Sequence, residues 1–335
     1  MIQTRKNSER KELFMKKVCI TVPLEADKQE KFMHLCEKYA YAVYFRDTKE
    51  MTPADYAEYE VIIGTPAPSD LARASSLRYL HLSMAGSNAF VKEGVLAPGV
   101  LLTNSSGTFG HAISEHMMGM VYSLYKKLHL YRDNQNESLW RDEGSVRSIY
   151  GAKVLVVGMG DIGEAFAKTA HALGMHVSGI RRTTVEKPAF IEAMYSPDDL
   201  KSIVGDFDIV ALSLPETAKT VHLFDEKMIG AMKDGAVLLN VGRGSAIDTD
   251  ALVRALQSGK LYGAGLDVTE PEPLPADHPL WKCKNCLITP HVSGFFHLRD
   301  TYDAIVSLAY NNLSAYFEGK TPKNVVDFST GYRKA

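Results

Sequence analysis

The order of apolar and polar residues divides the chain into alternating strands and helices. Short β-branched or apolar runs end in glycine or proline, and the segments between them carry apolar residues at helical spacing. The predicted strands are 17–22, 41–45, 60–64, 77–83, 154–157, 176–180, 207–214, 236–241, 262–267 and 286–289. The predicted helices are 27–39, 162–173 and 300–318. This alternation predicts an α/β fold whose parallel sheets are covered by helices.

The segment from His111 to Asn134 is the longest helical pattern. It is apolar on more than one side, so we predict one long helix buried between domains or between subunits. His111 and His116 are five residues apart and lie on different faces of such a helix, unlike the i, i+4 pair of a zinc protease. We therefore predict no metal site in this segment.

Length and charge narrow the classes of protein. A chain of 335 residues is long for one hydrophobic core, which predicts two domains. A net charge of −2 argues against nucleic acid and anionic membranes as partners. Residues 1–14 lack the apolar centre of a secretory signal and are interpreted as a frayed extension ahead of Met15. We predict a cytoplasmic protein with no membrane segment.

Cys283 and Cys286 form a C-x-x-C pair. Zinc needs four ligands, and no second close pair of Cys or His accompanies this one in the sequence. We interpret the two residues as thiols next to a buried strand and predict no metal cofactor.

Residues 154–163 read VLVVGMGDIG, which places a G-x-G-x-x-G pattern between a strand and a helix. Gly158 makes the tight turn, Gly160 lets the backbone approach a pyrophosphate, and Gly163 packs the helix against the strand. The N–H groups at the start of the helix, at Asp161 and Ile162, would bind the anion. Because a predicted strand precedes the pattern and a predicted helix follows it, the pattern predicts a dinucleotide site.

The residues that distinguish NAD from NADP are expected about 20 residues further on, where NAD enzymes place an acidic residue. This chain has Arg181, Arg182 and Thr183 there. Two guanidinium groups and a hydroxyl suit the 2′-phosphate of NADP. The alternative is that the arginines are solvated charges at a strand end. We predict NADP as the preferred cofactor, with NAD possible.

Three further segments follow predicted strands, where open α/β sheets bind ligands. They contain Arg243 in NVGRG, Glu272 in LDVTEPEP and His291 in TPHVSG. Reduction of a keto acid by hydride needs a cation for the carboxylate and carbonyl, an acid for the new alkoxide, and a group that keeps this acid charged. Arginine, histidine and glutamate supply these functions. Each residue alone also has a purely structural interpretation.

Together with the glycine loop, these segments resemble the D-isomer-specific 2-hydroxyacid dehydrogenase family over nearly the whole chain after Met15. The arginine pair is similar to that of the NADP-linked glyoxylate and hydroxypyruvate reductases. The resemblance implies that His291 is the general acid, Glu272 its partner and Arg243 a substrate and cofactor ligand. Further residues implied to bind the cofactor are Leu214, Pro215, Thr220, Val241, Gly242, Asp267, which would hold the nicotinamide amide, His291 and Gly294. Residues implied to bind the substrate carboxylate are Ala85, Gly86 and Ser87.

The resemblance also implies an architecture of two Rossmann-like or flavodoxin-like domains. The cofactor domain, 110–294, would be inserted into a discontinuous substrate domain, 1–109 and 295–335. The helix after His111 would form a homodimer. Phe295 and Phe296 depart from the usual small residues after the histidine and would line the substrate pocket or pack in the core.

Two other functions remain open at the level of sequence. One is an NAD-linked enzyme of the phosphoglycerate dehydrogenase kind, acting on a phosphorylated or bulkier acid. The other is a non-catalytic regulator that senses dinucleotides. The complete set of Arg243, Glu272 and His291 argues against a sensor, which needs no proton donor.

Overall fold

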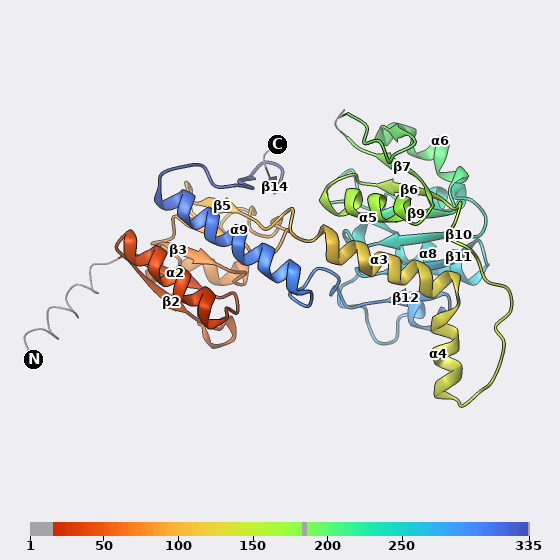
Figure 1. The fold of residues 1–335 in the computed structure, drawn as a ribbon, viewed down its shortest axis with the longest axis horizontal. Helices are drawn as coiled ribbons and strands as arrows, with labels where there is room; N and C mark the ends of the chain where they lie inside the picture. Colours follow the sequence, from red (N-terminus) through yellow and green to blue (C-terminus); the bar gives the residue numbers. More distant parts are fainter. Residues whose placement is uncertain (1–15, 183–185, 334–335) are drawn as a thin grey trace, which may run out of the picture. The chain divides into compact units, whose positions relative to one another are not determined.

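The computed structural model describes residues 16–182 and 186–333, which form two compact units (Figure 1). The first unit comprises the chain up to Thr108 and again from Tyr302, and the second comprises Phe109–Thr301. The sequence places the return to the first unit between 294 and 295, whereas the structure has it after Thr301. The interpretation of residues 1–14 and the prediction for Thr183 lie outside the described residues.

The first unit contains a sheet of five parallel strands in the order β2-β1-β3-β4-β5. This is the flavodoxin-like order. The strands are β1 (Lys16–Ile20), β2 (Tyr41–Phe45), β3 (Val61–Ile63), β4 (Tyr79–His81) and β5 (Leu101–Thr103). The helices α2 (Ala26–Lys38) and α9 (Arg299–Phe317) contact each other through an edge-to-face pair of Phe32 and Tyr310.

Shorter elements complete this unit. An antiparallel pair of strands, β13 and β14, lies near the carboxyl terminus. The bounds are η1 (Thr48–Glu50), η2 (Asp55–Glu58), η3 (Pro68–Arg73), β13 (Val326–Asp327) and β14 (Tyr332–Arg333). Strand β5 is missing from the sequence prediction because its three residues lie between the turn residues Pro98-Gly99 and the polar residues Asn104-Ser105-Ser106, a pattern that indicates a loop.

His81, at the end of β4, is fully buried. Its Nδ1 lies 2.7 Å from Thr103 Oγ1, and its Nε2 lies 3.4 Å from Ser105 Oγ. Burial lowers the pKa of His81 to about 3. The ring therefore stays neutral in the folded protein at pH values where the unfolded chain, with a histidine pKa of about 6.5, binds a proton.

We expect His81 to make the fold sensitive to acid. The free energy of unfolding should fall as the pH drops below about 6.5, because the unfolded state then binds more protons than the folded state. Between pH 7 and pH 5 this site should remove about 2 kcal/mol. Urea unfolding at both pH values checks this, with His81→Gln as the comparison. An equal loss of stability in both proteins would contradict it.

The second unit contains seven parallel strands in the order β12-β11-β10-β9-β6-β7-β8. The chain starts at β6 in the middle and builds the sheet in both directions, so β6 and β9 flank the topological switch point at which doubly wound folds bind nucleotides. The bounds are β6 (Lys153–Val157), β7 (His176–Ile180), β8 (Met194–Tyr195), β9 (Ile209–Leu212), β10 (Ala236–Asn240), β11 (Leu261–Leu266) and β12 (Cys286–Ile288).

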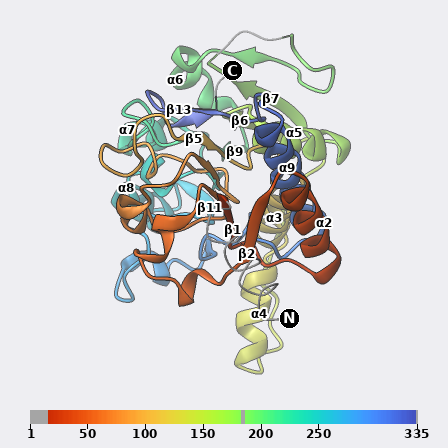
Figure 2. The same ribbon diagram turned by 90° about the vertical axis from the view of Figure 1, so that its left-hand side faces the viewer.

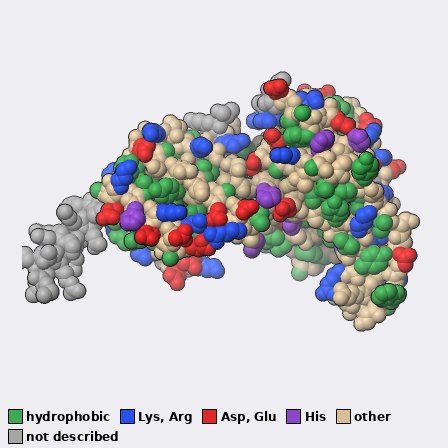
Figure 3. Space-filling view, viewed as in Figure 1, with side chains coloured by type: hydrophobic (Ala, Val, Ile, Leu, Met, Phe, Trp, Pro, Cys, Tyr) green, Lys and Arg blue, Asp and Glu red, His purple; other side chains and the backbone are tan. Residues whose placement is uncertain are grey.

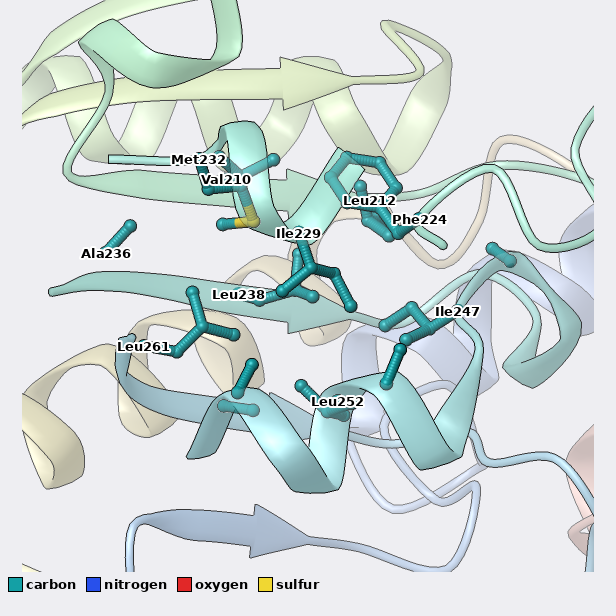
Figure 4. Close-up of a cluster of buried hydrophobic side chains, with 14 of the residues drawn as sticks. Val210, Leu212, Phe224, Ile229, Met232, Ala236, Leu238, Ile247, Leu252 and Leu261 are labelled. Atoms are coloured by element: carbon teal, nitrogen blue, oxygen red, sulfur yellow. The ribbon is translucent and has the colours of Figure 1, made fainter. Parts of the chain in front are cut away.

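Helices cover both faces of this sheet. On one face, α3 packs closely against β11, as shown by the distance of 2.9 Å between Leu124 Cδ2 of α3 and the position that a Cβ at Gly263 would occupy. The other face is covered by an apolar cluster that includes Leu252, Leu238 and Ile229 (Figure 4). The helices are α3 (Gly110–Tyr125), α4 (Leu128–Asn136), α5 (Asp161–Ala172), α6 (Leu200–Ile203), α7 (Glu226–Ala231) and α8 (Thr249–Gln257). The 3-10 turns are η4 (Pro197–Asp199), η5 (Val204–Asp206), η6 (Gly244–Ala246) and η7 (Pro279–Lys282).

The prediction of one helix from His111 to Asn134 is wrong. The structure has two helices, α3 and α4, and the chain turns between them at Lys127, whose φ is 57°. The His129 ring lies 2.9 Å from the Ser123 carbonyl, and Lys126 Nζ donates to the Arg147 carbonyl at 2.7 Å. As a result α4 projects away from the sheet of its unit (Figures 1 and 2). Among the described residues, no helix is both long and apolar enough to cross a membrane.

Candidate functional site

The predicted site residues of the second unit follow the carboxyl ends of its strands. In order along the sheet these residues are His291 after β12, Asp267 after β11, Arg243 after β10, Leu214 after β9, Gly158 after β6 and Arg181 after β7. Because all seven strands are parallel, these ends lie along one edge of the sheet. The topology therefore brings together residues that are far apart in the sequence.

The glycine loop has the geometry of a phosphate cradle. Gly158 has a φ of 106°, and a Cβ at Gly163 would lie 2.1 Å from the Gly158 carbonyl oxygen, so both positions require glycine. A Cβ at Gly160 would meet no atom within 4 Å. Gly160 is therefore not needed for packing, and its open side leaves room for a pyrophosphate at the start of α5.

The stretch after β9 borders both this loop and the arginine segment. A Cβ at Gly158 would lie 2.8 Å from the Ser213 carbonyl oxygen, and a Cβ at Gly242 would lie 2.5 Å from the Leu214 carbonyl oxygen. Thr220 Oγ1 donates to the Pro215 carbonyl at 2.7 Å and fixes the turn. Val241 donates its backbone N–H to the Leu212 carbonyl at 3.1 Å. These contacts bring Leu214, Pro215 and Thr220 next to the arginine segment.

Gly244, the neighbour of Arg243, packs against the loop that carries Glu272. A Cβ at Gly244 would lie 1.9 Å from the Thr269 carbonyl oxygen, so only glycine allows the two segments to approach this closely. Arg243 Nη1 donates to the Gly242 carbonyl at 2.7 Å, and Asn240 Nδ2 donates to the Arg243 carbonyl at 2.9 Å. The partly exposed guanidinium is thus held at the edge of the sheet.

His291 and Glu272 form a hydrogen-bonded pair, with 2.7 Å between Nδ1 and Oε1. Both side chains are partly exposed, at 45% and 43%. With Nδ1 directed at the carboxylate, Nε2 is the ring nitrogen left for a ligand. His291 has a φ of 54°, a conformation that is unfavourable for a residue with a Cβ.

Asp267 organises the segment that carries His291. Its side chain is 1% exposed and accepts hydrogen bonds from Thr289 Oγ1 at 2.6 Å, Val292 N at 2.9 Å and Ser293 N at 3.1 Å. Ser293 Oγ is a fourth donor. An ionised carboxylate has about four acceptor sites, and this segment fills them. A contact of Asp267 with the nicotinamide amide stays a prediction.

Sequence reasoning missed a second histidine–glutamate pair. His222 Nε2 lies 2.5 Å from Glu270 Oε2, and these side chains are 49% and 41% exposed. His222 also donates its backbone N–H to the Ser245 carbonyl at 2.7 Å, and its φ is 48°. The repeated Glu-Pro in EPEP was the available signal, since it offers Glu270 as well as Glu272.

In the first unit, the turn at Ala85, Gly86 and Ser87 follows β4. Asn104 Nδ2 donates to the Ala85 carbonyl at 2.8 Å, and the buried Ser87 donates its hydroxyl to the Gly331 carbonyl at 2.7 Å. Sequence reasoning singled out neither Asn104 nor the carboxyl-terminal segment. The polar run TNSSG after β5 was a signal for the first, and nothing in the sequence marked the second.

The remaining predicted residues lie as follows. Arg181 is partly buried and donates its backbone N–H to the Tyr195 carbonyl at 3.2 Å, and Arg182 is exposed. A Cβ at Gly294 would lie 3.2 Å from Ile113 Cδ1. Phe295 is 53% exposed, so its ring is not part of the core.

Burial raises the pKa of the Cys283 and Cys286 thiols, which disfavours the thiolate form. No group of three or more His, Cys, Asp or Glu residues suited to a metal ion occurs in the described part of the chain.

Comparison with known proteins gives the family. The family profile described as "D-isomer specific 2-hydroxyacid dehydrogenase, NAD binding domain" matches residues 118–293. The chain is 31% identical to glyoxylate/hydroxypyruvate reductase B of an Escherichia coli strain over 290 residues, which cover 84% of this chain and 88% of that protein. The chain belongs to the D-isomer-specific 2-hydroxyacid dehydrogenase family.

Solved structures of the family agree with the fold. A family member from Aeromonas salmonicida superposes with a TM-score of 0.80 at 30% identity, covering 94% of this chain and 99% of that chain. An NADPH-dependent glyoxylate/hydroxypyruvate reductase from Sinorhizobium meliloti, in complex with NADP and malonate, gives a TM-score of 0.72 at 25% identity, covering 96% and 99%. The predictions of two Rossmann-type parallel sheets and of an oxidoreductase with a nicotinamide dinucleotide site are confirmed.

Proposed function

We propose that this protein reduces a small 2-keto acid of the glyoxylate or hydroxypyruvate kind to the D-2-hydroxy acid, with NADPH as hydride donor. The observation that carries this proposal is the His291–Glu272 pair at 2.7 Å, at the same sheet edge as Arg243 and the glycine cradle. The names of the relatives support the substrate class. The rate of NADPH oxidation with a panel of keto acids tests it.

The site residues of the second unit would have separate roles in the reaction. A bound reduced nicotinamide supplies the hydride, and Gly158, Gly160 and the first N–H groups of α5 would hold its diphosphate. As hydride adds to the keto carbon, negative charge develops on the oxygen, and Nε2 of His291 delivers a proton there. Glu272 stabilises the protonated ring through Nδ1.

Arg243 would bind the substrate carboxylate and polarise the carbonyl, because a guanidinium matches a carboxylate with two parallel hydrogen bonds. In the first unit, the backbone N–H groups at Ala85, Gly86 and Ser87 would also receive the carboxylate. The hydrogen bonds from Asn104 and to Gly331 support this assignment, since they fix the turn before any substrate binds. The first unit is then the substrate domain and the second the cofactor domain.

We further propose that NADPH is preferred over NADH. Arg181 and Arg182 directly follow β7, the position at which this fold meets the adenosine ribose. Two cations there suit a 2′-phosphate.

Replacing Arg181 by alanine is expected to lower kcat/KM for NADPH by about 10- to 100-fold, since a charge-assisted hydrogen bond to the phosphate is lost. The value for NADH should change by less than about threefold, because NADH lacks that phosphate. Initial rates with both cofactors at a fixed keto acid concentration check this. An equal loss with both cofactors would contradict the assignment.

We also propose a cytoplasmic homodimer formed through α4 and the segment after it. Figure 3 shows exposed apolar side chains in the region where Figure 1 places α4. The exposed large apolar residues of α4 and the segment after it are Leu128 at 53%, Leu139 at 49% and Trp140 at 105% exposure. A monomeric protein rarely exposes several large apolar side chains close together to water. The molar mass in solution, by light scattering, tests the dimer.

A further inference from the structure

We infer that His116, on α3, is a positioning residue for the acid/base histidine and acts through Thr289 and Asp267. This inference rests on the proposed function, because it concerns the role of His291. His116 Nε2 lies 3.0 Å from Thr289 Oγ1, and Thr289 Oγ1 lies 2.6 Å from Asp267 Oδ1. The three side chains therefore form a continuous hydrogen-bonded chain from the helix to the segment that carries His291.

The direction of each hydrogen bond in this chain follows from the donors. The Asp267 carboxylate accepts two backbone N–H groups, which can only donate, so it acts as an acceptor. The single hydroxyl proton of Thr289 therefore points to Asp267. Thr289 must then accept from His116, whose Nε2 carries the proton in this arrangement. An Nε2–H is present in one neutral tautomer and in the protonated ring, so the contact does not require a charge.

The burial of Asp267 makes its hydrogen bonds, and the nearby His116 side chain, important for stability. Asp267 is 1% exposed and the His116 side chain 25%. A buried carboxylate is costly unless hydrogen bonds or an opposite charge compensate for the lost water. Among the described residues, His116 is the one side chain able to carry positive charge whose nitrogen comes within 4.0 Å of this carboxylate, at 3.9 Å. His116 thus adds a side chain able to carry positive charge beside a carboxylate whose acceptor sites are filled by residues 289–293, and it reaches this carboxylate through Thr289.

The chain of contacts fixes His291 on both sides. Before it, Thr289 is held by His116 and Asp267, and after it, Val292 and Ser293 donate to the Asp267 carboxylate. The backbone N–H of His291 itself donates to the Asp267 carbonyl at 2.8 Å. A residue with positive φ keeps its conformation only where its surroundings hold it. Loss of the His116 contact should therefore let the His291 ring move.

The expected kinetic result is a fall in kcat with little change in cofactor affinity. His116→Leu should lower kcat by about 10- to 100-fold, as for other residues that orient a catalytic group. The dissociation constant of NADPH, from fluorescence, should change by less than about threefold, because the glycine cradle is untouched. His116→Gln keeps a side-chain N–H and should restore most of kcat.

Three further variants refine the test. Thr289→Val removes only the hydroxyl and should have the same effect as His116→Leu, and the double variant should be no worse than Thr289→Val alone, because both break one chain of contacts. His111→Leu is the matched control: His111 lies on the same helix, is 62% exposed and lies within 4.0 Å of Glu115 and Asp300 instead. It should leave kcat unchanged.

Hydrogen exchange followed by mass spectrometry gives a readout that does not need turnover. A peptide that covers residues 291–293 should exchange faster in His116→Leu and Thr289→Val than in the wild type, and not in His111→Leu. If the wild type reduces no keto acid, the proposed function fails while the exchange rates still decide this inference. It is overturned if His116→Leu exchanges like His111→Leu, or if His116→Gln is as impaired as His116→Leu in kcat.

Discussion

Replacing His291 by alanine is expected to lower kcat for keto acid reduction by about 10³-fold or more. The reason is that Nε2 of His291 is the proton donor for the oxygen that becomes negative during hydride addition. Without it, water must protonate an alkoxide with no positioned acid. NADPH should still bind, since the glycine cradle and the arginines after β7 are unchanged. Initial rates and fluorescence binding measure the two effects separately.

The structure offers a control histidine for this experiment and a second histidine that is a rival candidate for the proton donor. His176 pairs with Glu192 in the same way, but it stands at the amino end of β7, so His176→Ala should keep full activity. The rival is His222, paired with Glu270 at 2.5 Å. A greater loss in His222→Ala than in His291→Ala would contradict the assignment of the proton donor.

Replacing Arg243 by glutamine is expected to lower kcat/KM for the keto acid by about 10³-fold, because one group both binds the carboxylate and stabilises the developing oxyanion. Arg243→Lys should recover only part of the loss, since an ammonium cannot form the two parallel hydrogen bonds of a guanidinium. The KM for NADPH should change far less than the KM for the keto acid. Steady-state kinetics with each substrate varied in turn measure this.

Arg254→Gln is the matched control for Arg243. Arg254 lies on α8 and pairs with Glu226 at 3.2 Å in an exposed ion pair, which contributes little. Its replacement should leave both KM values unchanged. A value of kcat/KM in Arg243→Gln within about tenfold of the wild type would contradict a direct role, because one transition-state hydrogen bond alone is worth more than that.

The sequence predicted the parts of the protein that depend on local rules. The glycine pattern after β6 requires specific backbone conformations. Gly158 has the positive φ and Gly163 the close packing that the pattern implies, and Gly160 has an open side. The class of fold followed from buried strands that alternate with helices, since this pattern has few architectures available.

Other features depend on contacts between distant segments and leave no local signal. The turn at Lys127 uses neither glycine nor proline, and it is held by a ring contact of His129 and by the Arg147 carbonyl. Asn104 and Gly331 contact the turn at Ala85, Gly86 and Ser87 only because the chain returns to the first unit at its end. The saturation of Asp267 by residues 289–293 also needs the fold, because two adjacent strand ends produce it.

The most direct test of the proposed reaction is the oxidation of NADPH, with NADH in parallel, against glyoxylate, hydroxypyruvate, pyruvate, phenylpyruvate and 2-ketoisocaproate, using wild type and His291→Ala. We expect oxidation with NADPH that depends on the keto acid, is fastest with the small acids, gives the D-hydroxy acid and disappears in the variant. Tight binding of NADPH without turnover of any keto acid by either cofactor would contradict a reductase and indicate a dinucleotide-sensing regulator.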